Sequence, residues 1–338
     1  MTTNDNNIKY KILPMVPPWA DLIIDAELMT KLLDASRRLS RLDGLVTKLP
    51  NRELFINAIV YKEANASCLI DGLRKSDQII NNYHNLLLSE SSNACNGERL
   101  TEETLLNIYF RLRNGLDDDP SRNQNLYARK AAFLTQYINN NHSLPKDPLF
   151  RMSILQYQFE ATHPFQDGDG RVGRLVTILY LIQEGLLSQP CLCLSGCYVQ
   201  QPDLYFEAEK SVSVSRNWKQ WVMHTLKCIC CASDYTMDLI RRIQEIQNRI
   251  EAAIAENNLK MDRLDLSVLL NIPYISPRQF LSGSIKSVNT AKKYLVQLER
   301  LGFLTKAKVG KEYVWVNTEL MSVLSSPPSP QERYCCQC

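Results

Sequence analysis

Several motifs that would assign a function directly are missing from this sequence. It has no Gly-Lys-Ser/Thr, so it lacks the Walker loop of P-loop nucleotide-binding proteins. No apolar run reaches the ~20 residues that a membrane-spanning helix needs, and the polar N-terminus lacks the basic-then-apolar layout of a signal peptide. These absences argue against a P-loop site and a membrane span. They favour a cytoplasmic protein in the producing cell, with export into a host cell left open.

Regular metal-binding spacing is missing as well. Eleven cysteines occur among 338 residues, an odd number at scattered positions, and without a secretory signal reduced thiols are expected rather than a disulfide framework. Two loose clusters, at 191–197 and 228–231, lack paired spacing. Buried small side chains are therefore the preferred interpretation, and a zinc site is the minor alternative. The C-terminal 335–338 segment lacks the aliphatic residues of a prenylation box, which leaves lipid attachment a weak option.

Histidine is scarce too, and one of the four lies in the most informative stretch. Residues 163–174 are His-Pro-Phe-Gln-Asp-Gly-Asp-Gly-Arg-Val-Gly-Arg, and an apolar run over 175–187 follows directly. A glycine-framed loop before a helix is suited to an anion, because the first N–H groups of the helix and its positive dipole end point at the ligand. Arginines add forked donors for phosphate oxygens, and histidine titrates near neutral pH. The stretch therefore predicts a nucleotide-phosphate site with its own general base.

Two simpler interpretations fit this stretch less well. Asp-Gly pairs usually mark turns, but chance does not readily gather two acids, two arginines and a histidine around such a turn. An EF-hand calcium loop beginning at Asp167 would place Arg171 at its fifth position and Val172 where glycine is required. The phosphate-site interpretation is therefore preferred.

The same stretch resembles the signature of Fic-domain proteins, His-x-Phe-x-Asp/Glu-Gly-Asn-Gly-Arg-x-x-Arg, and differs from it only at Asp169, where the family has Asn. The resemblance extends over about residues 10–235. Upstream, 61–72 resembles the inhibitory helix that some Fic proteins carry N-terminal to the core. Downstream, parts of 184–205 and the Trp218/Trp221 pair resemble the segment behind the Fic helix. The implied fold class is mainly α, a Fic-type helical bundle.

The resemblance also implies an activity. It is that of a protein adenylyltransferase, a nucleotidyltransferase that moves AMP from ATP to Tyr, Thr or Ser hydroxyls of target proteins and of itself. In this role His163 is the catalytic base, Asp167 holds Mg²⁺ as the cofactor, and Phe165 points inward to anchor the loop. The ATP phosphates would be bound by the residues that follow, Gly168, Asp169, Gly170, Arg171 and Arg174.

Three departures from the family pattern shape these expectations. An ionised Asp169 can only accept hydrogen bonds and would repel phosphate, so we expect weakened but surviving adenylyl transfer. Ser67, Asp71 and Gly72 stand where the inhibitory helix of the family has Ser-x-x-x-Glu-Gly. Because the Asp71 side chain is one methylene shorter, we expect its contact with Arg174 to be longer or bridged by water, and autoinhibition to be weak. Residues 113–131 show no strand pair for the usual target-binding flap.

Helical spacing of apolar residues dominates the rest of the chain. It predicts helices over about 21–43, 54–73, 101–113, 127–139, 149–160, 175–187, 204–231 and 236–256. The predicted domains are an N-terminal helical region over 1–100 with the inhibitory helix near 57–73, a Fic core over 101–235, a connecting helix over 236–259, a winged-helix domain over 260–320 and a disordered tail over 321–338.

The predicted winged-helix domain rests on a change of pattern near Lys260. The pattern predicts three helices, over 266–270, from Ser276-Pro277 and over 287–301, followed by a hairpin over 303–316. The segment resembles winged-helix domains fused behind Fic domains. Between 260 and 318, ten Lys or Arg stand against four Asp or Glu, which favours a DNA-binding surface. The candidate DNA contacts are Ser287, Asn289, Thr290, Lys293, Gln297, Lys306, Lys308 and Lys311. Protein contacts or dimerisation are the alternative, and a homodimer is expected.

Two other functions stay open on the sequence alone. The same site would serve a de-AMPylase that removes AMP from a modified protein, or an enzyme that transfers another phosphate-containing group. The chain would alternatively be a winged-helix DNA-binding regulator with a degenerate Fic domain. The intact His163, Asp167, Arg171 and Arg174 argue against that regulator.

Overall fold

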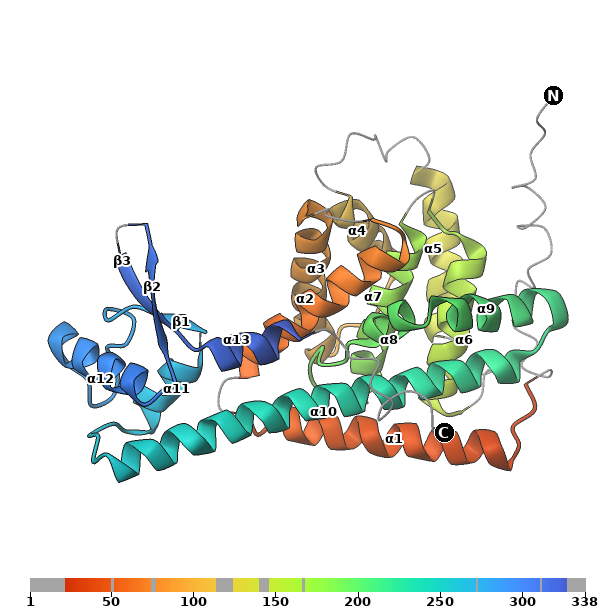
Figure 1. Cartoon of the computed structure of the whole chain (residues 1–338). Coiled ribbons are helices and arrows are strands. Elements are labelled where there is room, and N and C mark those ends of the chain that lie inside the picture. Colours follow the sequence, from red (N-terminus) through yellow and green to blue (C-terminus); the bar gives the residue numbers. More distant parts are fainter. Residues whose placement is uncertain are drawn as a thin grey trace. The chain divides into compact units, whose positions relative to one another are not determined.

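The computed structural model describes residues 22–49, 52–73, 77–113, 124–139, 146–165, 168–271, 273–310 and 312–326 (Figure 1). The chain divides into two compact units. The first takes its described residues from 1–43 and 59–234, and the second from 44–58 and 235–329. Among the described residues, no helix has the length and apolar character needed to cross a bilayer.

The first unit is helical, and α7 lies at its centre. Its helices are α1 (Ala26–Val46) up to Asp43, α2 (Arg52–Ile70) from Ile59, α3 (Asp77–Cys95), α4 (Glu102–Leu112), α5 (Gln124–Asn139), α6 (Pro148–Thr162), α7 (Asp169–Gln183), α8 (Leu194–Gln200), α9 (Pro202–Ser215) and the first part of α10 (Trp218–Glu256). Helices α3, α4 and α6 pack against α7, which is buried from Arg171 to Ile182. Gly173 permits the close approach of α6, since a Cβ there would lie 3.0 Å from the Phe159 ring.

Local sequence signals fix the start of α6. Asp147 accepts a hydrogen bond from the Leu149 N–H at 2.8 Å, and Pro148 occupies the first turn, where its missing N–H costs nothing. Trp221 from α10 donates its indole N–H to the Ser153 carbonyl of α6 at 2.7 Å. These contacts hold α6, whose C-terminal end leads into the 163–174 loop.

The helix boundaries behind α8 differ from the prediction. Separate helices were predicted over 204–231 and 236–256, but α9 ends at Ser215, and α10 then runs unbroken for 39 residues (Figure 1). The break falls at Arg216, whose φ of 54° is left-handed. No glycine or proline occurs between 218 and 256, so nothing in that segment interrupts the hydrogen-bond ladder. Helices α3 and α8 were not predicted.

The second unit combines helices with a small antiparallel sheet. Its further elements are α11 (Arg263–Asn271), β1 (Tyr274–Ile275), α12 (Val288–Arg300), β2 (Thr305–Val309), β3 (Glu312–Val316) and α13 (Thr318–Ser325). The strand order is β1-β3-β2, with Lys306 opposite Trp315 in the hairpin. Trp315 is buried and donates its indole N–H to Glu299 of α12 at 2.8 Å. The predicted hairpin is confirmed, and β1 adds a third strand that was not predicted.

Two predictions in this unit are wrong. The segment from Ser276 forms turns rather than a helix: the Gln279 side chain accepts the Ser276 N–H at 2.9 Å, and a short bridge between Ser282 and Ile285 follows. Residues 321–325, predicted as part of a disordered tail, belong to α13. There the Asn317 side chain caps the helix by accepting the Leu320 N–H at 2.9 Å.

Candidate active site

The 163–174 stretch runs from the end of α6 into the first turns of α7, and its first residue has an unusual backbone. His163 follows the last residue of α6 with a φ of 41°, a left-handed conformation that is uncommon for a non-glycine residue. Lys130 of α5 donates to the carbonyl oxygens of His163 and Thr162, at 2.6 and 3.3 Å. A cation at the C-terminal end of a helix is favourable, so Lys130 stabilises both the end of α6 and the position of His163.

Phe165 anchors the loop, as predicted. Its side chain is buried and stacks on Tyr109 of α4, with ring centroids 4.1 Å apart and an angle of 6° between the rings. Its backbone N–H donates to Oδ1 of Asp169 at 2.7 Å. The Tyr109 ring therefore fixes the side chain of Phe165, and the Asp169 carboxylate fixes its backbone. Gln166 and Asp167 lie outside the described residues, so the predicted metal ligand has no described position.

His163 and Asp169 form a contact within the loop. Nδ1 of His163 lies 3.1 Å from Oδ2 of Asp169, and the Asp169 side chain is only 5% exposed while that of His163 is 43% exposed. The hydrogen bond to Asp169 raises the pKa of His163 above its ordinary value. With Nδ1 against the carboxylate, Nε2 is the ring nitrogen through which His163 would exchange a proton with a substrate.

Two glycines shape the start of α7. Gly168 precedes the helix with a φ of 85°, a conformation that favours glycine. A Cβ on Gly170 would lie 2.7 Å from Nη1 of Arg174 and 3.1 Å from a carboxylate oxygen of Asp71. The absence of side chains at these positions lets the arginine side chains and Asp71 approach the backbone at the helix N-terminus.

Asp71 holds both motif arginines. Its Oδ1 accepts a hydrogen bond from Nη2 of Arg174 at 2.6 Å, and its Oδ2 accepts one from Nε of Arg171 at 2.9 Å. Ser67, one turn earlier on α2, accepts two bonds from Arg174 at 2.8 Å, one at its hydroxyl and one at its carbonyl. The expectation of a long or water-bridged contact is therefore wrong, because the position of the α2 backbone compensates for the shorter side chain.

Two carboxyl groups near these arginines, one half-buried and one fully buried, were not singled out from the sequence. Glu160 of α6 lies 3.6 Å from Nη1 of Arg174 and accepts a hydrogen bond from Tyr205 at 3.3 Å, and burial raises its pKa to about 7. Burial would lower the pKa of the Arg174 guanidinium, but the carboxylates of Asp71 and Glu160 raise it on balance. The signal for Glu160 was its place one helical turn before His163.

The second buried carboxyl group is Glu63 of α2. It accepts hydrogen bonds from the backbone N–H of Ser195, at 2.8 Å, and from the Ser195 hydroxyl, and burial raises its pKa to about 7. Glu63 and Ser67 lie four residues apart on one face of α2, and Asp71 follows four residues later, in the turn directly after the helix. Glu63 thus attaches α2 to the segment at Ser195, and the same face carries Ser67 and Asp71 to Arg174.

The predicted DNA contacts all belong to the second unit. Asn289, Lys293, Lys306 and Lys308 are exposed, whereas Thr290 and Gln297 are half-buried. Ser287 uses its hydroxyl to cap α12, accepting the Thr290 N–H at 3.1 Å. The Lys306 ammonium lies 4.2 Å from the centroid of the Tyr313 ring. Lys311 lies outside the described residues.

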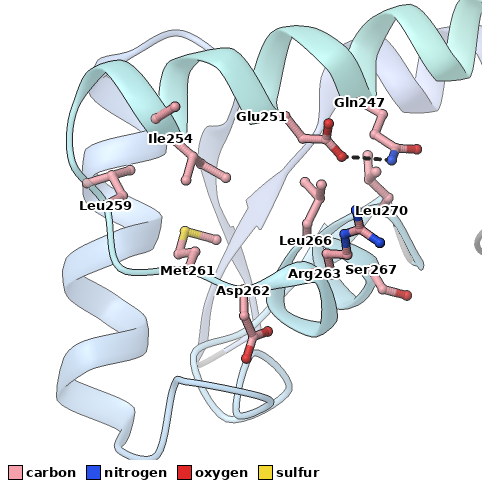
Figure 2. A pocket seen from close by; sticks show the side chains of 11 residues that line it. Gln247, Glu251, Ile254, Leu259, Met261, Asp262, Arg263, Leu266, Ser267 and Leu270 are labelled. Carbon is pink, nitrogen blue, oxygen red and sulfur yellow. Dashed lines mark hydrogen bonds between the residues drawn. The ribbon is translucent and has the colours of Figure 1, made fainter.

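A cavity of about 680 Å³ also lies in the second unit. Residues from the end of α10, from α11 and from the connection between them line it (Figure 2). Apolar side chains such as Ile254 and Leu266 lie beside Glu251, which accepts a hydrogen bond from Gln247 at 2.9 Å. No residue of the 163–174 loop lines this cavity, so it is separate from the candidate active site.

The cysteines of the two clusters are buried. Seven of the eight described cysteines are buried, which confirms the interpretation of most of them as small core side chains. The described part of the chain contains no group of three or more His, Cys, Asp or Glu that would hold a metal ion.

Known proteins resemble this chain in sequence and in fold. Residues 29–104 match the model of the Fic/DOC family N-terminal region, and residues 75–181 match that of the Fic/DOC family. Protein adenylyltransferase fic-1 of Caenorhabditis briggsae is 33% identical over 54 residues, which cover 16% of this chain and 11% of that protein. The solved structure of a Fic family protein from Desulfovibrio desulfuricans G20 aligns with a TM-score of 0.51 and 15% identity, covering 89% of this chain and 98% of that one. The fold, mainly helical with a small C-terminal three-stranded sheet, is therefore shared.

Proposed function

We propose that this chain, which matches the Fic/DOC family model over residues 75–181 and the Fic/DOC N-terminal model over residues 29–104, is a protein adenylyltransferase. It transfers AMP from ATP to a Tyr, Thr or Ser hydroxyl of target proteins and of itself. The observation that carries this proposal is the arrangement of one base and two arginines around the start of α7: His163 precedes Gly168, and Arg171 and Arg174 follow it. The name of the matched relative, an adenylyltransferase, supports the same chemistry.

In the proposed reaction, the hydroxyl oxygen of the target attacks the α-phosphorus of ATP. A bond from that oxygen to phosphorus forms while the bond from phosphorus to the oxygen bridging the α- and β-phosphates breaks, and pyrophosphate leaves with the electron pair. The hydroxyl proton passes to Nε2 of His163. Backbone N–H groups from Gly168 to Gly170 stabilise the charge on the α-phosphate, and Arg171 and Arg174 neutralise the pyrophosphate.

Mg²⁺ is the cofactor of this proposal. One carboxylate together with phosphate oxygens is a usual ligand set for this ion, so Asp167, an oxygen donor directly before Gly168, fits it. The ion would supply charge neutralisation at the ATP phosphates.

The contacts of Asp71 support an autoinhibited resting state. Both arginines that would receive the pyrophosphate donate to this one carboxylate. A carboxylate and a phosphate compete for the same guanidinium donors, so Asp71 must withdraw before ATP binds productively. The segment that forms α2 resembles the inhibitory helix of some Fic proteins, and Glu63 attaches this helix to the rest of the unit. Both features are consistent with an inhibitory role.

The direct test uses ATP labelled separately at the α- and γ-phosphates. We expect α-label, and no γ-label, to become attached to protein, and His163→Ala to abolish the attachment. Transfer of γ-label would indicate phosphate transfer instead. Release of AMP from a modified protein, without label uptake, would indicate de-AMPylation. Binding to DNA without any nucleotide turnover would favour the regulator.

The second unit supports a further candidate role, that of bringing the enzyme to DNA-associated targets. Its helix α12 and hairpin carry exposed Lys293, Lys306 and Lys308, in a segment with an excess of positive charge. Fluorescence anisotropy with a labelled duplex at several salt concentrations tests this role. We expect Lys306→Ala with Lys308→Ala to weaken binding and to reduce its salt dependence, and no salt-dependent binding would refute it.

A further inference from the structure

Asp169 has both carboxylate oxygens engaged within the loop. Its Oδ1 accepts the Phe165 N–H at 2.7 Å, and its Oδ2 lies 3.1 Å from Nδ1 of His163. The side chain is 5% exposed although it occupies the first residue of α7. Both oxygens therefore contact residues that precede α7, His163 and Phe165, and do not face solvent.

The hydrogen-bonding capacity of a carboxylate fixes the partner's role. An ionised carboxylate has acceptors and no donor, so Nδ1 of a neutral His163 must carry the hydrogen in this contact. A neutral imidazole has one N–H, and Nε2 is then the acceptor. The contact selects the tautomer that a general base acting through Nε2 requires, and it fixes the orientation of the ring.

We propose that Asp169 is a positioning residue for His163, which holds the imidazole in the Nδ1–H tautomer with Nε2 as the proton acceptor. The inference rests on the proposed function, because it assigns His163 the role of base. It replaces the expectation that Asp169 meets the ATP phosphates and weakens their binding. On this proposal, Asp169 has a role that differs from that of the Asn at the same position of the family signature.

Substitution by Leu separates the two roles, because Leu has a shape close to that of Asp but neither a charge nor a hydrogen-bond acceptor. Without the carboxylate, nothing at position 169 holds the hydrogen on Nδ1 or fixes the orientation of the ring. A base without its fixed tautomer and orientation loses about 10²-fold or more in kcat. A residue that repels phosphate would instead give a gain in activity and a lower KM for ATP when it is replaced by Leu.

The first measurement is the tautomer itself, read from imidazole ¹⁵N chemical shifts of the full-length protein at alkaline pH. The signal of His163 is identified by its loss in His163→Ala, among only four histidines. We expect Nδ1–H in the wild type and a mixture of the two tautomers in Asp169→Leu. Glu160→Gln is the matched control, since it removes a half-buried carboxyl group near the site whose hydrogen bond comes from Tyr205, and it should leave the tautomer unchanged. An Nε2–H tautomer in the wild type would overturn the proposal without any variant at position 169.

The second measurement is the rate of adenylyl transfer for Asp169→Leu in an Asp71→Gly background, which removes the competing carboxylate. We expect kcat to fall about 10²-fold or more while the KM for ATP changes less than about threefold. Unchanged or increased kcat would refute the positioning role. If His163→Ala kept full activity, the proposed function would fail instead, and the tautomer measurement would still decide the contact between His163 and Asp169.

Discussion

Replacing Asp71 by glycine should activate the enzyme strongly. The carboxylate makes two charge-assisted hydrogen bonds, at 2.6 Å to Arg174 and at 2.9 Å to Arg171. Such bonds contribute about 1.5–3 kcal/mol each, and the lower value applies because the Asp71 side chain is 22% exposed. Two bonds then amount to about 3 kcal/mol, which corresponds to roughly 100-fold in an equilibrium between closed and open sites. The weak autoinhibition expected from the shorter side chain, and with it a modest gain for Asp71→Gly, is therefore revised upward.

The assay for this activation is the initial rate of auto-AMPylation, followed by intact-protein mass. Ser67→Ala is the matched control on the same helix face. It removes one neutral acceptor from Arg174, leaves the Ser67 carbonyl and both Asp71 contacts, and should raise the rate by about tenfold at most. Circular dichroism and the Tm verify that α2 remains folded in each variant. A rise of less than about threefold for Asp71→Gly would refute the inhibitory role of these contacts.

Two further predictions concern pH. The hydrogen bond to Asp169 raises the pKa of His163 above its ordinary value of 6.5, and only the neutral ring is a base. The value of kcat should therefore increase with pH, with its midpoint above pH 6.5. A midpoint at or below pH 6.5 would contradict this prediction. Burial raises the pKa of Glu63 from 4.5 to about 7, so the folded state holds more protons between these values, and the free energy of unfolding should fall as pH rises through that window. Comparing the pH dependence of the Tm with that of Glu63→Gln isolates this contribution, and identical profiles would count against it.

The chemistry of the loop was predictable because its residues are contiguous. A base, glycines and two arginines within 163–174 indicate a phosphate site regardless of what packs around them. Phe165 was expected to point inward, and the structure stacks it on Tyr109. The hairpin over 303–316 follows equally from local pattern, since alternating residues and a turn determine it.

Contacts between distant segments were not predictable. Side-chain length suggested a weak contact for Asp71, but the position of the α2 backbone, which no local rule supplies, brings both arginines to it. Glu63 and Glu160 lie on ordinary helical positions, and their burial depends on Ser195 and Arg174, far away in sequence. The helix predicted from Ser276-Pro277 failed for another reason, because the side chain of Gln279 satisfies the backbone locally and stabilises a turn.

The central claim is that His163 accepts the proton while AMP moves to a protein hydroxyl. The most direct measurement is label transfer from α-labelled ATP in the Asp71→Gly background, with and without His163→Ala, followed by mass spectrometry of the modified peptide. The account predicts an AMP adduct on a Tyr, Thr or Ser residue that depends on His163. An adduct that persists in His163→Ala, or transfer of the γ-phosphate in place of AMP, would contradict it.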